Sequence, residues 1–321
     1  MYLVTGCAGF IGSKTAELLL KDGKKVIGID NLNDYYSIEL KIYHLGCLSK
    51  YEGFKFYKAD IENKGPLKNI FKKYKFKAVL NLAARAGVGY SVVNPQIYQA
   101  TNILGTINLL ELCRDFKVKK FLLASTSSVY SGQKMPFVET LSVNTPISPY
   151  SATKKAAEML CYSYHYLFGI DVSILRYFTV YGPAGRPDMS VYKFIKLIDS
   201  GKPITLFGDG TQSRDFTYVD DIAKGTVKAL KRLGFEVINL GGNKPYKMNN
   251  VIQLIERYLG KKARINRLSP HKSDIKDTWA NIAKAKKLLK WKPEIGLETG
   301  IRNTIEWYKG NPGLIKKVDL V

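Results

Sequence analysis

The sequence predicts an α/β protein with a doubly wound parallel sheet, followed by a smaller α/β lobe on the C-terminal side. Three observations predict this fold. In the first half, short β-rich runs alternate with stretches whose apolar residues recur at helical spacing. A glycine-rich turn at residues 6–12 joins the first strand-like run to the first helical one. With 321 residues, the chain is also long enough for a large core.

Each expected element follows from its local pattern. β-rich runs predict strands at residues 1–6, 24–30, 54–60, 77–83, 119–125 and 171–177. Helical apolar spacing predicts helices at residues 10–23, 65–75, 102–116 and 151–169. Gly- and Pro-rich loops then interrupt the pattern, so we expect a Rossmann-type lobe over 1–176 and a second lobe over most of 177–321. The run near 235–241 predicts one more strand, which returns to the first sheet.

The charge balance is strongly basic. The chain has 50 Lys and Arg against 27 Asp and Glu, which gives a net charge of +23. Such an excess suggests anionic ligands or nucleic acid. The lysines are spread over the expected helix faces, however, and form no basic tail. We therefore interpret them as a solvated surface and expect no nucleic-acid partner.

The cysteines and the hydropathy pattern indicate the compartment. Cys7, Cys47, Cys113 and Cys161 are widely spaced without a C-x-x-C pair, which predicts a reduced protein that holds no metal. No apolar run approaches the length of a membrane span, and the glycine turn begins too early to leave room for a signal peptide. The sequence therefore predicts a soluble, cytoplasmic protein without a membrane partner.

The glycine-rich turn predicts a dinucleotide site. Gly6, Gly9 and Gly12 follow a strand and open a helix, where glycines let backbone N–H groups approach a pyrophosphate. Asp30 ends the next strand, where an acid accepts hydrogen bonds from the adenosine ribose hydroxyls and repels a 2′-phosphate. The predicted cofactor is therefore NAD. Asp60 ends the third strand, and we expect it either to contact the cofactor near adenine or to cap a helix.

A Tyr-x-x-x-Lys pair predicts the reacting end. This spacing places a phenol and an ammonium one helical turn apart, but the chain contains it at five places, so the spacing alone selects none of them. Position favours Tyr150 and Lys154. They begin a helix after the strand that ends in a row of hydroxyl residues, at the sheet edge where such folds bind ligands.

The charges expected around Tyr150 are large enough to make it a base. Its pKa must fall from about 10 to about 7, which requires about 4 kcal/mol. One unit charge at about 4 Å supplies that much at an effective dielectric constant of about 20. Lys154 and an oxidised nicotinamide ring are both cationic, so together they are sufficient.

Several motifs resemble the extended short-chain dehydrogenase/reductase superfamily. They are "TGCAGFIG" (5–12), "NLAARAGVGYS" (81–91), "TNILGT" (101–106), "STSSVY" (125–130), "PYSATK" (149–154) and "RYFTVYGPAGRPDM" (176–189). Within the superfamily, the chain is similar to the nucleotide-sugar epimerases. "GIDNLNDYY" (28–36) and the motif at 176–189 are most similar to the UDP-glucuronate 4-epimerase family. The resemblance covers most of the chain.

The resemblance implies a reaction and a set of residues. Tyr150 would take the proton of the sugar 4-hydroxyl while hydride passes from C4 to NAD, and the 4-keto sugar would turn over before the hydride returns. Lys154 would lower the Tyr150 pKa and hold the nicotinamide ribose, and Thr126 would hydrogen-bond the reacting oxygen. The further cofactor contacts implied are Phe10, Ile11, Asn31, Ile61, Ala83, Ala84, Arg85, Asn102 and Tyr177.

The hydroxyl row indicates which sugar is bound. Relatives that dehydrate or decarboxylate their sugars carry an acid where this chain has Ser127 and Ser128. We expect Thr126 and these two serines, with Thr179 and Arg186, to bind a glucuronate carboxylate. They would hold the β-keto acid away from the geometry in which it loses CO₂. The alternative for the row is strand-end capping.

The resemblance also assigns the UDP end of the substrate, in the second lobe. Leu206 in "PITLFG" is expected at the uracil, Arg214 at the diphosphate, and Asp274 at the uridine ribose. The alternative for Arg214 is a salt bridge to a neighbouring aspartate. The apolar helices at 102–113 and 154–168 predict a homodimer with a four-helix contact, as in the family.

The chain departs from the family pattern at three positions. Gly89 replaces an arginine, Ser131 replaces a glycine, and Ala86 stands where glucose epimerases have a lysine that Arg85 would replace. An epimerase of UDP-glucose or UDP-N-acetylglucosamine stays an alternative, although Asn rather than Thr179 would then be expected. A catalytically silent scaffold or an RNA-binding protein is disfavoured by the intact Tyr150 and Lys154 pair and by the dispersed charge.

Overall fold

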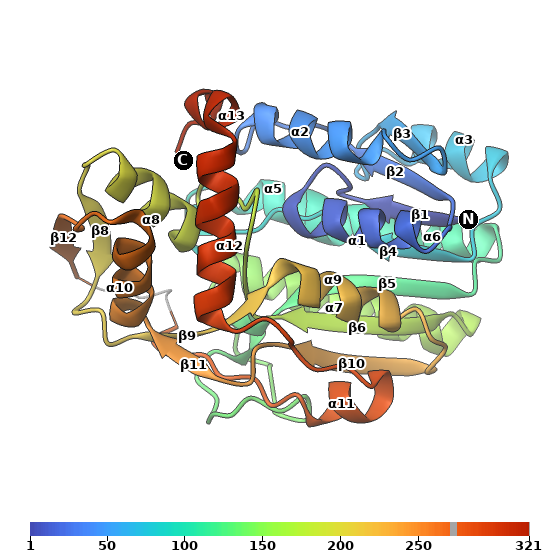
Figure 1. The fold of residues 1–321 in the computed structure, drawn as a ribbon. Coiled ribbons are helices and arrows are strands. Elements are labelled where there is room, and N and C mark those ends of the chain that lie inside the picture. The colour runs from blue at the N-terminus through green and yellow to red at the C-terminus, as the bar shows by residue number, and fades with distance from the viewer. Residues whose placement is uncertain (270–274, 321) are drawn as a thin grey trace.

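The computed structural model describes residues 1–269 and 275–320, and its centre is a seven-stranded parallel sheet (Figure 1). The strand order is β10–β6–β5–β4–β1–β2–β3, and neighbouring strands are parallel throughout. The order reverses between β1 and β4, where such sheets open a ligand crevice. The predicted fold class is confirmed. The strands are β1 (Tyr2–Thr5), β2 (Val26–Asp30), β3 (Phe54–Lys58), β4 (Ala78–Asn81), β5 (Lys120–Thr126), β6 (Asp171–Tyr177) and β10 (Phe235–Leu240).

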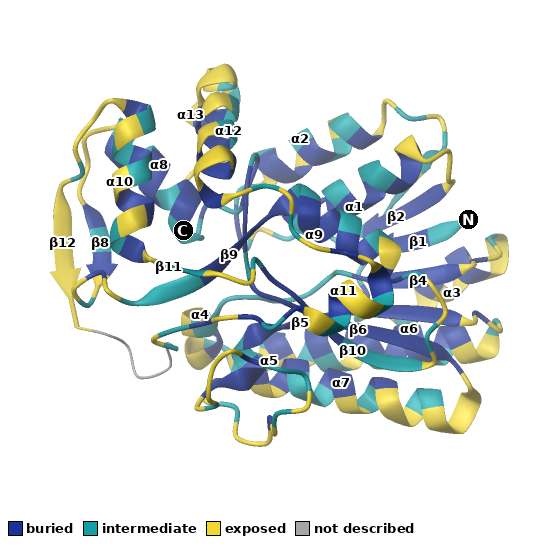
Figure 2. Cartoon of the chain, turned by 60° about the horizontal axis from the view of Figure 1, so that its bottom comes forward, coloured by how far each residue is buried: buried dark blue, intermediate teal, exposed yellow. Residues whose placement is uncertain are grey.

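Helices cover both faces of this sheet. One layer contains α1 (Phe10–Lys21), α2 (Ile38–Leu48), α9 (Val219–Lys228) and α11 (Ala283–Leu289), and the other contains α3 (Lys64–Lys73), α6 (Gly105–Asp115) and α7 (Pro149–Phe168). Side chains alternate between the layers along each strand: Leu122 of β5 packs in the first core, and Phe121 and Leu123 pack in the second. Burial on both faces explains why the inner strands β4, β5 and β6 are mostly apolar, whereas the edge strand β3 is more exposed and carries two lysines (Figure 2).

The second lobe has a core of its own. A three-stranded sheet of β7 (Thr179–Tyr181), β9 (Ser213–Tyr218) and β11 (Pro245–Lys247) lies beside the pair β8 (Ile204–Phe207) and β12 (Ile265–Leu268). The helices of this lobe are α8 (Ser190–Asp199), α10 (Met248–Leu259), α12 (Leu297–Gly310) and α13 (Pro312–Lys317). Their apolar faces share one cluster, which includes Ile195, Ile252 and Ile301.

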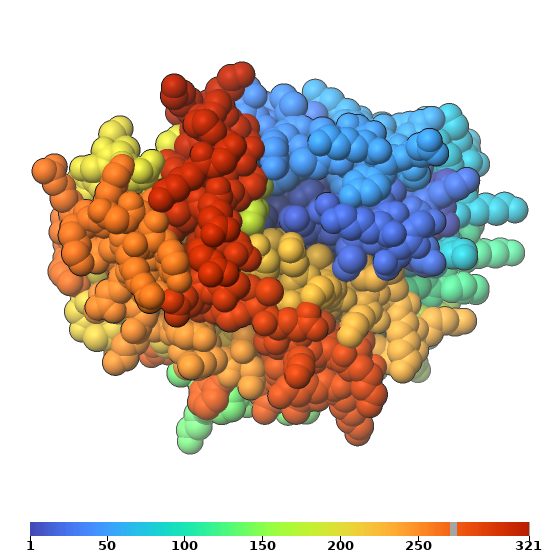
Figure 3. Space-filling view, in the orientation of Figure 1, coloured from blue at the N-terminus to red at the C-terminus, as the bar shows by residue number. Residues whose placement is uncertain are grey.

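The chain passes between the lobes more than once. After β9 it returns to the first lobe, where α9 packs against α1 and β10 pairs with β6. After α10 and β12 it returns again as α11, which packs against β10. The C-terminal residues then lie against both lobes, and α13 contacts α2 (Figure 3).

Short elements shape the edge of the sheet where the strands end. α4 (Val88–Val93), α5 (Pro95–Gln99) and the π-helical turn η1 (Ala100–Leu104) connect β4 to α6. The 3₁₀ turn η2 (Ser127–Tyr130) follows β5 directly. Among the described residues, no helix is both apolar enough and long enough to cross a membrane.

Candidate active site

The turn between β1 and α1 is so tight that its glycines could not carry side chains without close contacts. Gly6 has a φ of +66°, a conformation that favours glycine. A Cβ atom on Gly12 would lie 2.0 Å from the Gly6 carbonyl oxygen. Helix α1 is capped by Gly9 without a side-chain hydrogen bond, so the first N–H groups of the helix are available to an anion.

Asp30, at the end of β2, is held by backbone donors. Its Oδ2 accepts a hydrogen bond from the Ala8 N–H at 3.2 Å, and its Oδ1 accepts one from the Leu32 N–H at 2.9 Å. Burial raises the pKa of Asp30, whereas these donors and the Lys41 charge act to lower it. Each carboxylate oxygen can accept a second bond, so the group can still bind ribose hydroxyls.

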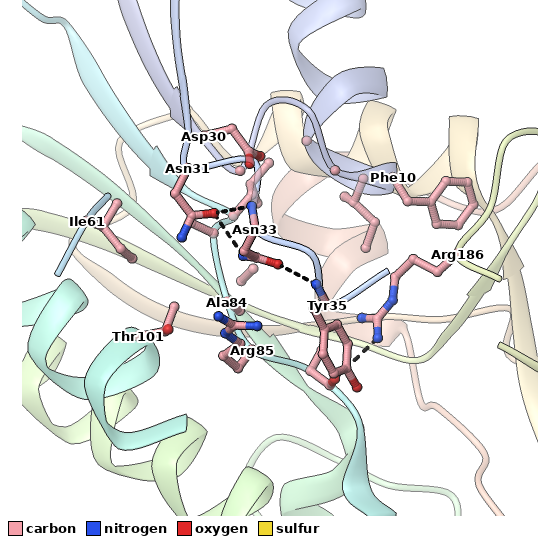
Figure 4. A pocket seen from close by; sticks show the side chains of 18 of the residues that line it. Phe10, Asp30, Asn31, Asn33, Tyr35, Ile61, Ala84, Arg85, Thr101 and Arg186 are labelled. Atoms are coloured by element: carbon pink, nitrogen blue, oxygen red, sulfur yellow. Dashed lines mark hydrogen bonds between the residues drawn. The ribbon is translucent and has the colours of Figure 1, made fainter. Parts of the chain in front are cut away.

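One pocket runs from this turn to the start of α7 (Figure 4). It brings together most of the residues that the sequence predicts for the cofactor site and the reacting end. These are Gly6, Gly9, Phe10, Ile11, Gly12, Asp30, Asn31, Asp60, Ile61, Ala83, Ala84, Arg85, Tyr150, Lys154, Tyr177 and Arg186. Asp60 accepts a hydrogen bond from the Asn31 side chain at 2.7 Å, which fixes this end of the pocket.

Helix α7 positions Tyr150 and Lys154 within its first two turns. Its N-terminus is fixed by a capping box, in which the Ser148 and Ser151 side chains bond each other's backbone N–H. Burial lowers the pKa of Lys154 to about 8, although the Glu158 carboxylate one turn later opposes this effect. The residue is 3% exposed.

The electrostatic surroundings of Tyr150 differ from the expectation. Burial raises the pKa of the phenol, and a hydrogen bond with the Thr126 side chain and the Arg186 charge act to lower it. The charge of Lys154, which we expected to lower this pKa, is not among the influences resolved on it. Burial is therefore the largest influence on this pKa in the protein alone.

The hydroxyl row begins at Thr126, the last residue of β5. Its Oγ1 accepts a hydrogen bond from the Ser128 N–H at 3.1 Å and so caps η2. Because this oxygen accepts from the backbone, its hydroxyl proton can be donated to the Tyr150 oxygen. Ser131, which replaces a family glycine, donates to the Ser128 carbonyl at 2.8 Å and adds a further bond to the row.

Arg186 joins the two lobes at the pocket. Its guanidinium forms a bidentate pair with Asp188, at 3.0 and 2.6 Å, and also donates to the Ala86 carbonyl at 3.2 Å. It lies 5.5 Å from the Tyr35 ring centroid (Figure 4). The side chain is thus fixed in place by contacts on several sides.

Eight predicted residues are not among the described residues that line this pocket. Three of them form the hydroxyl row: Thr126 ends β5, and Ser127 and Ser128 begin η2 directly after it. The other five lie as follows. The Asn102 amide bonds the Arg85 backbone and so shapes the wall. Thr179 lines an adjacent hollow, which Phe10 and Arg186 also border. Leu206 is buried in the core of the second lobe. Arg214 donates to the Ser213 and Lys276 carbonyls, and Asp274 lies outside the described residues.

Sequence reasoning missed a cluster at the end of the pocket. Tyr35, Tyr36 and Lys41 line it, and the Lys41 ammonium lies 4.6 Å from the Tyr36 ring centroid and bonds the Asn33 carbonyl at 2.5 Å. The dense polar and aromatic run "NLNDYY" after Asp30 was the available signal. The other lining residues that the sequence did not predict are Ile29, Asn33, Ala59, Leu82, Ala86, Thr101, Ala124 and Ser125.

Comparison with known proteins gives the family. The model of the GDP-mannose 4,6 dehydratase family matches residues 3–304. The UDP-glucuronate 4-epimerase of Thermodesulfobacterium geofontis is 59% identical over 318 residues, which cover 99% of this chain and 98% of that protein.

Comparison with solved structures also identifies UDP-sugar 4-epimerases as relatives of this chain. The UDP-glucuronic acid 4-epimerase of Bacillus cereus, in complex with UDP-glucuronic acid and NAD, matches with a TM-score of 0.91 and 41% identity over 96% of this chain and 99% of that one. The UDP-glucose 4-epimerase of Thermotoga maritima, with UDP-glucose, matches with a TM-score of 0.88 and 32% identity over 97% and 99%. The chain therefore belongs to the GDP-mannose 4,6 dehydratase family of nucleotide-sugar enzymes, within which it is a homologue of the UDP-sugar 4-epimerases.

Proposed function

We propose that the protein interconverts UDP-glucuronate and UDP-galacturonate by NAD-dependent 4-epimerisation. One observation carries this proposal: Tyr150, bonded by Thr126, lies at the end of a dinucleotide pocket beside a hydroxyl row that contains no acid. The 59% identity to a UDP-glucuronate 4-epimerase supports the same sugar.

The residues of the pocket fit NAD. Gly6 and Gly12 leave no room for a Cβ, so the turn stays tight and its backbone N–H groups can approach a pyrophosphate, and the Asp30 carboxylate can accept ribose hydroxyls. When bound, NAD provides the group that accepts hydride from the sugar C4 and returns it. Lys154 supplies a buried cation next to this end of the pocket.

Tyr150 transfers the proton of the sugar 4-hydroxyl, and Thr126 assists it by hydrogen bonding. Tyr150 removes it as the 4-keto sugar forms, and Thr126, whose oxygen already accepts from Ser128, donates to the developing charge. After the 4-keto sugar has turned over, hydride returns to the opposite face of C4, and Tyr150 gives the proton back to the same 4-oxygen. Epimerisation therefore needs one acid–base group that acts in both directions.

The hydroxyl row suits a carboxylate. A 4-keto glucuronate is a β-keto acid, and it loses CO₂ when its carboxylate lies perpendicular to the carbonyl plane. Ser127 and Ser128 offer neutral donors, whereas an acid at either position would repel the substrate. Arg186 and Thr179, which border the adjacent hollow, add a cation and a further hydroxyl.

A product assay tests the proposal directly. The purified protein is incubated with UDP-glucuronate, UDP-glucose or UDP-N-acetylglucosamine, and the products are separated and identified. We expect conversion of UDP-glucuronate without added reductant and without net formation of NADH, because each hydride returns to the sugar. Preferential turnover of a neutral sugar would contradict the assignment to glucuronate, and NADH formed in proportion to product would indicate a dehydrogenase.

Asp30 is expected to make the enzyme select NAD over NADP. A 2′-phosphate next to this carboxylate would be repelled, and each 1.4 kcal/mol of repulsion weakens binding about tenfold. In cofactor-stripped protein, calorimetry should give at least about tenfold tighter binding of NAD, and Asp30→Asn should reduce the ratio. Asp22→Asn, at an exposed site, is the control and should leave it unchanged. Equal affinities in the unmodified protein would refute the assignment.

The family's homodimer is proposed for this chain as well. Met159, Tyr162 and Tyr166 form an exposed apolar stripe at helical spacing along α7, with 50, 47 and 77% of each side chain exposed. Sedimentation velocity should therefore give a dimer, and Tyr166→Glu should shift it towards monomer; a monomeric unmodified protein would contradict this. A cytoplasmic location is proposed from the four cysteines, which are all free thiols.

A further inference from the structure

Both ends of the hydroxyl row are tied to the same ion pair. At the N-terminal end, the Ser125 hydroxyl donates to Glu158 Oε1 at 2.6 Å. At the C-terminal end, the Tyr130 hydroxyl accepts from Arg176 Nη1 at 2.8 Å. Residues 126–129 lie between these two attachments, so the row is bracketed by a closed ring of buried hydrogen bonds.

The ion pair that closes this ring is rigid. Arg176 donates to both Glu158 oxygens, through Nε at 2.9 Å and Nη2 at 2.7 Å, and each side chain is 3% exposed. A planar fork that meets a carboxylate in this way fixes orientation as well as distance. The guanidinium also lies 4.8 Å from the Tyr130 ring centroid.

Tyr130 is held on its other sides too. Its hydroxyl donates to Asn239 Oδ1 at 2.8 Å, which connects η2 to β10. Its ring stacks on Phe137, with centroids 4.9 Å apart and planes 20° apart. The hydroxyl thus accepts from one strand and donates to another, so its position is determined by the sheet.

Glu158 connects the row to the reacting helix. Tyr150, Lys154 and Glu158 follow one another at intervals of four along α7, and therefore share a face. The acid lies on the helix that carries the base, Ser125 is on β5, and Arg176 is on β6. The ion pair thus joins the three elements that set the distance between Thr126 and Tyr150.

We propose that the Glu158–Arg176 pair is a positioning device, which holds the hydroxyl row at the distance from Tyr150 that proton transfer requires. The proposal rests on the proposed function, because it concerns the same site. A displacement of about 1 Å at such a distance costs roughly 10²-fold in rate. Loosening either attachment should therefore reduce kcat while leaving KM for the sugar nearly unchanged. Tyr130 is not among the described residues that line the pocket, and Ser125, which does line it, uses its hydroxyl to bond Glu158.

The test uses two mild variants and a matched control. Ser125→Ala and Tyr130→Phe are the two mild variants, and each removes one hydroxyl from the ring of hydrogen bonds. A third variant, Glu158→Gln, removes the negative charge of the ion pair. The control is Asp171→Asn, which neutralises another buried pair between β5 and β6, with Lys120 Nζ 2.5 Å from Asp171 Oδ1. That pair lies at the opposite ends of the same strands, so the control carries a similar stability defect away from the site.

We expect Ser125→Ala and Tyr130→Phe to lower kcat by about 10- to 100-fold, with KM for UDP-glucuronate within about threefold of the unmodified value. Amide hydrogen exchange in residues 126–129 should become faster in both variants. Asp171→Asn should retain kcat and leave exchange at these residues unchanged. If Glu158→Gln does not fold, the two hydroxyl variants still decide the question.

Turnover within about twofold of the unmodified enzyme in both hydroxyl variants would overturn the proposal, as would an equal loss of kcat in Asp171→Asn. Hydrogen exchange needs no substrate, so it separates the two hypotheses. Unmodified protein that does not convert UDP-glucuronate would refute the proposed function. Unchanged exchange at 126–129 in the hydroxyl variants would refute the positioning role whichever sugar is the substrate.

Discussion

Replacement of Tyr150 by Phe is expected to reduce turnover of UDP-glucuronate by about 10²- to 10⁴-fold, the usual contribution of a general acid–base group. The phenol is the group that Thr126 bonds, and Phe keeps the ring that packs edge-on against Tyr98 at 6.1 Å. Fold and NAD binding should therefore be nearly unchanged. Initial rates of epimer formation, with circular dichroism and NAD titration of the same samples, measure this effect.

The chain supplies a matched control for this change. Tyr192 and Lys196 have the same spacing on α8. The Tyr192 hydroxyl, however, is buried and has no hydrogen-bond partner among the described residues, and Lys196 bonds the Ile315 carbonyl. Tyr192→Phe should thus leave turnover unchanged. A rate loss of less than about tenfold in Tyr150→Phe would mean that another group acts as the base.

Replacement of Arg186 by Ala should change the product as well as the rate. The side chain holds the Ala86 carbonyl and pairs with Asp188, so its loss loosens the pocket wall and removes the cation expected near the carboxylate. The keto acid then loses CO₂ from C5, and the enolate takes up a proton to give a UDP-4-keto-pentose. Each 1.4 kcal/mol of lost restraint changes the product ratio about tenfold.

Two signals identify this side reaction. Mass spectrometry detects the decarboxylated sugar, and the hydride that is not returned leaves one NADH for each such product. Arg186→Lys is the matched variant, because it keeps the charge without the bidentate contact, and it should decarboxylate less than Arg186→Ala. Wild-type affinity together with epimer as the sole product in Arg186→Ala would show that the carboxylate binds elsewhere, and would favour a neutral sugar.

The sheet and the turn around the cofactor could be predicted from the sequence because their signals are local. The inner strands β1, β4, β5 and β6 are buried on both faces and are mostly apolar. The glycines at 6, 9 and 12 are required by close backbone contacts. The family was predicted from motifs of the same local kind, and it is confirmed.

The residues that the sequence did not reveal depend on long-range packing. Lys41 and Tyr35 reach the pocket only because the segment after β2 folds back across it. Tyr130 begins another of the five Tyr-x-x-x-Lys spacings, at Lys134, and nothing in that spacing indicates a structural role. Its part in the buried ring of hydrogen bonds depends on Arg176, which is 46 residues further along the chain. The desolvation that raises the pKa of Tyr150 likewise depends on packing that no short motif encodes.

The repeated passage of the chain between the lobes has a consequence for synthesis on the ribosome. When residue 177 has left the exit tunnel, the free edge of β6 has no partner, because β10 pairs with it only from Phe235 onward. The side of α1 that contacts α9 is likewise uncovered until α9 follows. An open strand edge and an exposed helix face are sites at which nascent chains aggregate. Stable folding of the first lobe is therefore expected only once β10, which ends at Leu240 of the 321 residues, has emerged. A fragment that ends at residue 176 would need a chaperone or the missing segment in trans.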